Sequence, residues 1–195
     1  EEQVLTEPCR RNTAPCIAYA TFRIAKDDPE AVMIVTPSDH YIQQEDRFEE
    51  VMRHALAHAR THPDLVTVGI RPTYPATGYG YIQKEDTGEL ISPAMAFKEK
   101  PDLKTAVGFL NAGSFVWNSG MFVWSVAAIR HALESFVPDI ARTFDGLTPY
   151  YHTDEEPARV NAAYETCQSI SIDYAVMEKA KNAVVIDGDF GWSDI

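Results

Sequence analysis

Two aspartates lie far apart in the sequence, and each follows a run of apolar residues typical of a buried strand. Asp39 comes after residues 31–35, and Asp194 comes after residues 183–186. Open α/β sheets bind ligands outside the carboxyl ends of their strands, and hard divalent cations prefer carboxylates and leave positions for phosphate oxygens. If the two strands are neighbours, these carboxylates could hold one Mg²⁺. A turn or helix-cap role for Asp39 is the commoner alternative, and for the adjacent His40 we favour a structural role.

Two arginines precede a predicted helix. Arg10 and Arg11, with Asn12, come immediately before residues 13–25, for which Thr13 is a candidate N-cap. Guanidinium groups beside free helix N–H groups can bind an anion. A solvated pair of arginines at the start of a helix is an equally good interpretation.

A third group of polar residues lies among short strand-like segments in the middle of the chain. Gly80 belongs to a loop whose glycines let the backbone approach a ligand. Glu99 and Lys100 follow a strand, and Asn118 lies in a predicted tight turn over residues 117–121, where its amide could hold sugar hydroxyls. A simple turn, a solvated charged edge and an amide that only holds its own turn are the structural alternatives.

The elements that must position these residues alternate between strands and helices. Apolar runs at residues 31–35, 65–70 and 183–186 predict strands buried on both faces, and residues 48–59 carry one apolar stripe at helical spacing. Strand–helix–strand order with right-handed crossovers favours an α/β fold with a parallel sheet covered by helices.

The remaining segments predict a mixed sheet or β-rich insertion followed by helices, and the length suits one domain. We expect Trp117, Phe122 and Trp124 to be core residues. Strands are predicted at residues 78–82, 94–98, 114–117 and 121–124, and helices at 103–111, 126–136, 139–144, 158–167 and 172–180.

Composition excludes several classes of protein. The formal net charge of −12 argues against broad nucleic-acid binding, and no apolar run is long enough to cross a bilayer. The three cysteines are odd in number and form no CxxC or Cys/His cluster, so neither a disulfide framework nor a zinc site is indicated. We expect small buried thiols in a reducing compartment.

An ordered set of segments, spanning nearly the whole chain, resembles one family, the bacterial mannose-1-phosphate guanylyltransferases of the nucleotidyltransferase superfamily. RNTAP, FKEKP, SIDYAVMEK and GWSDI resemble the guanylyl branch more than the uridylyl or thymidylyl branches. The full set is EPCRRNTAPCIA from Glu7, VTPSDHYI from Val35, TGYGYIQ from Thr77, FKEKPD from Phe97, WNSGMFVW from Trp117, SIDYAVMEK from Ser171 and GDFGWSDI from Gly188.

The resemblance implies a Rossmann-like nucleotidyltransferase fold with a mixed, mostly parallel sheet flanked by helices. It implies Mg²⁺-dependent, in-line transfer of GMP from GTP to mannose-1-phosphate, which releases pyrophosphate. The protein would position the phosphates and neutralise developing charge, a task that its acidic composition leaves to a metal ion and a few cations. We further expect a cytoplasmic enzyme that can form a homo-oligomer, with no nucleic-acid or membrane partner.

The resemblance also assigns roles to individual residues. Asp39, Lys100 and Asp194 would be catalytic, with the two aspartates as metal ligands. The substrate-binding residues would be Gly80, Glu99, Asn118 and Asp173 around the sugar and its phosphate, and Arg11 and Asn12 facing the nucleotide.

One departure from the family pattern concerns the glycine-rich GGxGxR-type segment that wraps the nucleotide phosphates. The first glycines here are Gly69 and Gly78, too late for that segment, and the family continues beyond the point where this chain stops. We therefore expect residues 1–195 to be an incomplete nucleotidyltransferase domain, truncated at the N-terminus and inactive alone.

Three alternatives remain open. Another sugar-1-phosphate nucleotidyltransferase would share most of these motifs. A non-catalytic regulatory homologue would have no need of both Asp39 and Asp194. A glycosyltransferase would need an acidic DxD motif, found here as Asp187-Gly188-Asp189.

Overall fold

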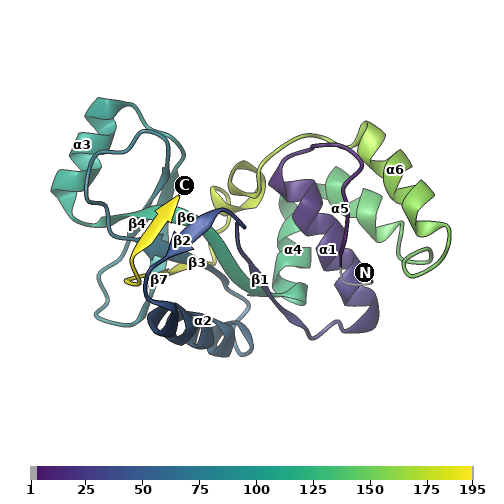
Figure 1. Cartoon of the computed structure of the whole chain (residues 1–195), viewed down its shortest axis with the longest axis horizontal. Helices are drawn as coiled ribbons and strands as arrows, with labels where there is room; N and C mark the ends of the chain where they lie inside the picture. Colours follow the sequence, from purple (N-terminus) through teal and green to yellow (C-terminus); the bar gives the residue numbers. More distant parts are fainter. Residues whose placement is uncertain (1–3, 195) are drawn as a thin grey trace. The chain divides into compact units, whose positions relative to one another are not determined.

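The computed structural model describes residues 4–194, which divide into two compact units (Figure 1). One unit contains residues 4–31 and 125–179, and the other contains residues 32–124 and 180–194. The chain therefore passes between the units after Ala31, after Trp124 and after Lys179.

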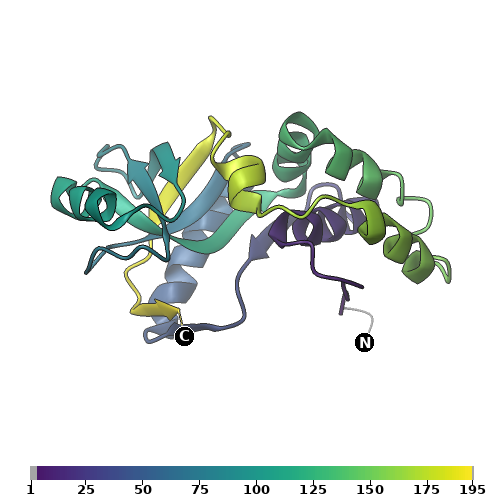
Figure 2. The ribbon, with the colours of Figure 1, turned by 90° about the horizontal axis from the view of Figure 1, so that it is seen from above.

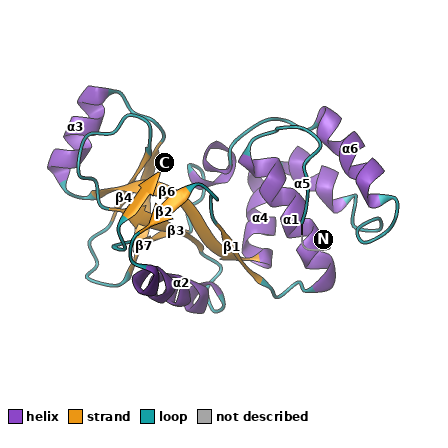
Figure 3. Cartoon of the chain, viewed as in Figure 1, coloured by secondary structure: helices purple, strands orange, loops and turns teal. Residues whose placement is uncertain are grey.

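The first unit is helical (purple in Figure 3). The ring of Tyr19 packs against Phe144, Tyr151 and Tyr164 at centroid distances of 6.1, 6.0 and 6.5 Å, so aromatic contacts between helices form much of its interior. Its elements are α1 (Thr13–Asp27), α4 (Val126–Phe136), α5 (Pro138–Asp145), α6 (Glu156–Thr166) and a π-helical turn, η1 (Asp173–Met177).

Helix α1 forms where it was predicted, with a different cap. The N-cap is Asn12, whose side chain accepts a hydrogen bond from the backbone N–H of Thr13 at 2.9 Å. Thr13 is the first helical residue instead, and its hydroxyl accepts from the backbone N–H of Ile172 at 2.8 Å. This bond ties the start of α1 to the segment before η1.

The second unit is built on a six-stranded sheet in the order β1-β6-β3-β7-β5-β4, and β4 also pairs with β6. Five of these strands therefore form a closed ring, with β1 added on β6. A separate two-stranded sheet pairs β2 with the C-terminal β8, and Figure 2 shows β8 apart from the larger sheet. The elements are β1 (Val32–Val35), β2 (His40–Ile42), α2 (Glu45–Ala59), β3 (Leu65–Ile70), β4 (Gly80–Lys84), β5 (Ile91–Lys98), α3 (Leu103–Ala112), β6 (Phe115–Ser125), β7 (Ala183–Asp187) and β8 (Trp192–Asp194).

The expectation of a mostly parallel sheet is wrong. Among the described pairings with a known register, β3 and β7 run parallel, while β3–β6, β4–β5, β4–β6, β5–β7 and β2–β8 are antiparallel. Strands β1 and β3 flank helix α2 in the sequence, but β6 lies between them in the sheet. A buried strand has the same apolar composition in either orientation, which is why the sequence did not reveal this pairing.

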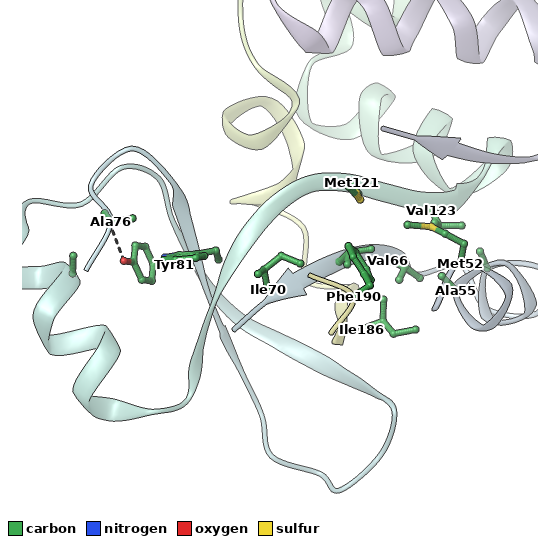
Figure 4. Close-up of a cluster of buried hydrophobic side chains, with 14 residues drawn as sticks. Met52, Ala55, Val66, Ile70, Ala76, Tyr81, Met121, Val123, Ile186 and Phe190 are labelled. Carbon is green, nitrogen blue, oxygen red and sulfur yellow. Dashed lines mark hydrogen bonds between the residues drawn. The ribbon is translucent and has the colours of Figure 1, made fainter. Parts of the chain in front are cut away.

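The core of this unit lies between the sheet and α2 (Figure 4). The apolar stripe of α2 brings Met52 and Ala55 against Val66, Val123 and Ile186 from three strands. A smaller cluster of Ile82, Val116 and Val185 lies on the alternate positions of β4, β6 and β7. Strands β3 and β7 are therefore buried on both faces, as predicted for residues 65–70 and 183–186. The same prediction for residues 31–35 is wrong, because β1 leaves Ile34 43% exposed.

Strand β6 replaces the two short strands and tight turn expected over residues 114–124. It runs without a break from Phe115 to Ser125. Its register with β3 shifts opposite Thr67 and Gly69, and Gly120 has a φ of +72°. The irregularity absorbs the glycine inside the strand, as a bulge does. Trp117, Phe122 and Trp124 are buried, as predicted.

Two smaller expectations also fail. The helix expected at residues 172–180 is the single π-helical turn of Asp173–Met177. Of the cysteines expected to be buried, Cys167 is buried while Cys9 and Cys16 are exposed. Within residues 4–194, none of the helices has the length and apolar character needed to span a membrane.

Candidate active site

The pairing of β2 with β8 brings the two predicted metal aspartates together. His40 lies directly opposite Asp194 in this antiparallel pair, and Asp39 precedes β2 by one residue. One ligand atom from each of Asp39, His40 and Asp194 lies within 4.8 Å of the others. The sequence suggested that the two aspartates would meet because the strands before them are neighbours. That explanation is wrong, because β1 and β7 are not neighbours in the sheet. Sequence reasoning missed β2 and β8 because three residues are too few to show a period.

His40 is more closely involved in this cluster than the sequence suggested. Its Nδ1 lies 3.0 Å from the indole Nε1 of Trp192, and the two rings meet edge-to-face at 5.1 Å and 89°. Its Nε2 lies 3.9 Å from Oδ1 of Asp194. The His40 side chain is 9% exposed, against 42% for Asp194, so the imidazole lies beneath the accessible carboxylate.

The chemistry of this cluster suits a hard divalent cation. Two exposed carboxylates offer oxygen ligands, and their exposure leaves positions for the oxygens of a phosphate or of water. Asp39 and Asp194 would be the residues that hold such an ion. A soft-metal site is not indicated by this donor set, because no cysteine is part of it.

A second group of predicted residues meets where β4 pairs with β6. Gly80 lies directly opposite Asn118 in this pair. A Cβ atom built on Gly80 would lie 2.5 Å from Oε2 of Glu99 and 3.4 Å from Cβ of Asn118. The space over Gly80 is therefore already shared by Glu99 and Asn118, two residues with polar groups that suit sugar hydroxyls.

Lys100 extends this group toward solvent. Its Nζ lies 3.7 Å from Oε1 of Glu99, and its side chain is 63% exposed while that of Glu99 is 16% exposed. Lys100 also has a φ of +42°, a backbone conformation uncommon outside glycine that often accompanies functional loops. Its ammonium group is accessible to an anion.

An aromatic wall links the two groups. Tyr79, next to Gly80, packs edge-on against Trp117 at 5.1 Å and against Trp192 at 5.4 Å. Burial raises the pKa of Tyr79 to about 12, with further contributions from a hydrogen bond and charge interaction with Tyr74 and from the negative charge of Asp194. Sequence analysis did not assign Tyr79 or Trp192 to the site, although both lie inside motifs that it singled out.

The other three predicted site residues belong to the helical unit. Arg11 donates from Nε to the carbonyl of Tyr164 at 2.8 Å and from Nη2 to that of Glu165 at 2.9 Å. Both carbonyls belong to the last turn of α6, where a cation is favourable. Asn12 caps α1, and Asp173 begins η1, where its carbonyl accepts from the N–H of Glu178.

The helical unit holds a cavity of about 290 Å³, and the sheet unit holds one of about 610 Å³ that includes Trp117 and Trp192 of the aromatic wall in its lining. The larger cavity is lined in part by Arg71, Lys84 and Asp187. Lys84 Nζ lies 2.7 and 2.6 Å from the two carboxylate oxygens of Asp187. The first acidic residue of the DxD sequence is therefore engaged in an ion pair.

Comparisons with known proteins identify the family of the chain. Residues 1–195 match the nucleotidyl transferase family along their whole length, and the chain belongs to that family. The chain is 38% identical over 204 residues to a mannose-1-phosphate guanylyltransferase of Escherichia coli, which confirms the resemblance seen in the motifs. That alignment covers 100% of this chain and 44% of the relative, so the chain spans less than half the length of the E. coli protein.

Two solved structures are similar over almost the whole chain. One is a Thermus thermophilus protein described as a mannose-1-phosphate geranyltransferase, with a TM-score of 0.87 and 29% identity over 97% of this chain and 54% of that one. The other is described as a mannose-6-phosphate isomerase from Helicobacter pylori, with a TM-score of 0.81 and 28% identity over 96% of this chain and 72% of that one. The nucleotidyltransferase fold expected from the motifs is confirmed, except that most strand pairs of the sheet are antiparallel.

Proposed function

We propose that this chain is part of a mannose-1-phosphate guanylyltransferase, which transfers GMP from GTP to mannose-1-phosphate and releases pyrophosphate. The observation that carries the proposal is the approach of the Asp39 and Asp194 carboxylates in the β2–β8 sheet. A relative with this activity in its name, 38% identical over the full chain, supports the choice of sugar and nucleotide.

In this reaction the protein has to position the reacting phosphates and to neutralise their negative charge. A phosphate oxygen of mannose-1-phosphate attacks the α-phosphorus of GTP in line, a new P–O bond forms, and the bond to the departing pyrophosphate breaks. Mg²⁺ bound at the aspartates would supply positive charge to the phosphates. Lys100 would add a second positive charge, which matters in a protein with a net charge of −12.

Substrate recognition is divided among the remaining predicted residues. Glu99 and Asn118, which share the space over Gly80, would hydrogen-bond sugar hydroxyls. Arg11 and Asn12 as nucleotide-facing residues, and Asp173 as a sugar-side residue, are further parts of the proposal, which rest on the family motifs. We also infer that both compact units belong to one nucleotidyltransferase domain, because the family match runs through both.

The test measures Mg²⁺-dependent binding of GDP-mannose by calorimetry, which does not require turnover. Asp39→Asn and Asp194→Asn are each expected to weaken that binding at least about tenfold, because a metal carboxylate is lost. Asp189→Asn is the matched control, since it removes an exposed charge near the same end of the chain and is expected to bind like the parent. UDP-glucose and dTDP-glucose are expected to bind more weakly than GDP-mannose.

Each alternative predicts a different result. Binding that is unaffected by metal and by both aspartate substitutions would favour a regulatory homologue. Loss of binding on Asp189→Asn alone would favour the DxD assignment of a glycosyltransferase. Tighter binding of another sugar nucleotide would change the substrate and keep the class.

A further inference from the structure

We propose that His40 is a positioning residue for the metal aspartates. Held by Trp192, its imidazole directs an Nε2–H group at Asp194 and does not itself bind the cation. The inference rests on the proposed function and deepens it, because it divides the three-residue cluster into two ligands and one supporting residue.

The tautomer of the His40 ring follows from its hydrogen-bond partner. An indole N–H can only donate a hydrogen bond, so Nδ1 of His40, 3.0 Å from Nε1 of Trp192, is the acceptor and carries no proton. In the neutral imidazole the proton is then on Nε2. Nε2 is the nitrogen nearest Asp194, at 3.9 Å from Oδ1. A protonated ring nitrogen has no lone pair to give to a metal.

The orientation of the ring is fixed by pairing and by packing. His40 and Asp194 are Cα partners, and Trp192 lies two residues before Asp194, so the three side chains share one face of the β2–β8 sheet. Trp192 is held in turn by Tyr79 at a ring distance of 5.4 Å and by Trp117 at 6.4 Å. A half-turn of the ring about its Cβ–Cγ bond would break the 3.0 Å hydrogen bond from Nε1 of Trp192 to Nδ1, so this bond fixes the orientation of the ring.

The consequence is an electrostatic bias on an otherwise exposed carboxylate. The 3.9 Å separation is longer than a hydrogen bond, so the contact described is an N–H dipole directed at Asp194. Such a dipole favours the orientation of the carboxylate in which Oδ1 faces Nε2 of His40. Outer-shell partners of this kind change metal affinity by about 10–100-fold when they are removed.

The experiment uses Mn²⁺ as the probe and measures its dissociation constant by electron paramagnetic resonance. His40→Ala is expected to weaken Mn²⁺ binding about tenfold. His40→Gln is expected to recover most of that loss, because its amide N–H₂ group can donate from a position near that of Nε2. Tyr41→Phe is the matched control, since Tyr41 alternates to the other face of β2 and is 52% exposed.

A second measurement needs no substitution. Electron spin-echo spectra of Mn²⁺ bound to the unaltered protein are expected to lack a directly bonded nitrogen. The ¹⁵N shifts of His40 are expected to show an unprotonated Nδ1 with and without Mg²⁺. A directly bonded nitrogen in the Mn²⁺ spectrum would overturn the proposal and make His40 a ligand.

The outcomes separate this proposal from the proposed function. If Asp39→Asn and Asp194→Asn abolish Mn²⁺ binding and His40→Ala leaves it unchanged, the metal site stands and the role of His40 is refuted. If all three variants bind Mn²⁺ like the parent, the metal site itself is refuted, and the role of His40 with it.

Discussion

Gly80 is a glycine of the candidate site with little free space above its backbone. A Cβ there would lie 2.5 Å from Oε2 of Glu99, the flexible end of a side chain that can move. Gly80→Ala is therefore expected to fold normally but to displace Glu99, weakening GDP-mannose binding about tenfold by calorimetry, the loss of roughly one charged hydrogen bond. Gly78→Ala is the control, because nothing lies within 4 Å of its added Cβ. Equal affinities for the two variants would contradict a substrate-facing Gly80.

Glu156 is the centre of a buried hydrogen-bond network in the helical unit. It is buried, and its carboxylate accepts hydrogen bonds from Tyr19 at 2.7 Å, from Arg23 at 2.8 Å and from the backbone of His152 at 2.7 Å. Glu156→Gln is expected to lower the free energy of unfolding by about 2 kcal/mol. The amide nitrogen of glutamine cannot accept from the His152 N–H, and the neutral amide oxygen accepts more weakly from the Arg23 guanidinium than a carboxylate does. Glu155→Gln, at a 62% exposed neighbour, is expected to change it by less than about 0.5 kcal/mol.

The same carboxylate gives the stability of this unit a defined pH dependence. Burial raises the pKa of Glu156, but hydrogen bonds from the His152 backbone, Tyr19 and Arg23 outweigh burial and leave the pKa lowered. A group with a lowered folded-state pKa stabilises the protein fully above its unfolded pKa, and this stability is lost as pH falls through the folded pKa. Urea unfolding below about pH 4 should therefore show a smaller difference between the parent and Glu156→Gln than at about pH 7.

At this scale the sequence predicted residue types better than residue partners. Asp39 and Asp194 could be singled out from their motifs and from the apolar runs before them. The contact of Trp192 with His40 could not, because it depends on the register of two three-residue strands. Arg11 could not be placed either, because its partners are backbone carbonyls that carry no sequence signal.

Among the elements, the closed ring of strands depends on a glycine in β3. A Cβ on Gly69 would lie 2.5 Å from Cγ2 of Val116 and 2.7 Å from Cγ1 of Val185, both in the small inner cluster. Gly69→Ala is expected to destabilise the protein by about 1–3 kcal/mol through overpacking. Gly108→Ala in α3, where an added Cβ meets nothing within 4 Å, is expected to stabilise it by about 0.5–1 kcal/mol. Chemical denaturation of both variants checks the opposite signs.

The elements themselves were largely predictable, and their pairing was not. Helical periodicity located α2 because this helix buries one stripe of regularly spaced side chains. The sequence predicts two strands in place of β6, because Gly120 and the polar residues before it are typical of turns. In the structure the side chain of Asn118 provides a local hydrogen bond at this irregularity, because its Oδ1 accepts from the N–H of Gly120 at 3.1 Å. A side-chain contact thus keeps an irregular segment within the sheet.

For the whole molecule, a strongly negative net charge opposes the binding of the proposed phosphate substrates, so their binding requires positive charge close to the site. A net charge of −12 repels anions at long range, so binding of the proposed substrates would depend on the few cations and on a metal held by the aspartates. Composition alone predicted this general field and excluded broad nucleic-acid binding. The division into two units was not predicted, because both are assembled from segments distant in the chain.

The pairing of β2 with β8 has a consequence for the order in which the protein is made. His40 and its partner Trp192 are 152 positions apart, and β3 must likewise wait for β7. During synthesis the first aspartate leaves the ribosome long before the second, and the sheet unit stays open until the last strands arrive. Such long-range closure is slow, and the proposed cation site would form only after it is complete. A nascent or C-terminally nicked chain would therefore present neither a metal nor a sugar nucleotide with a formed site.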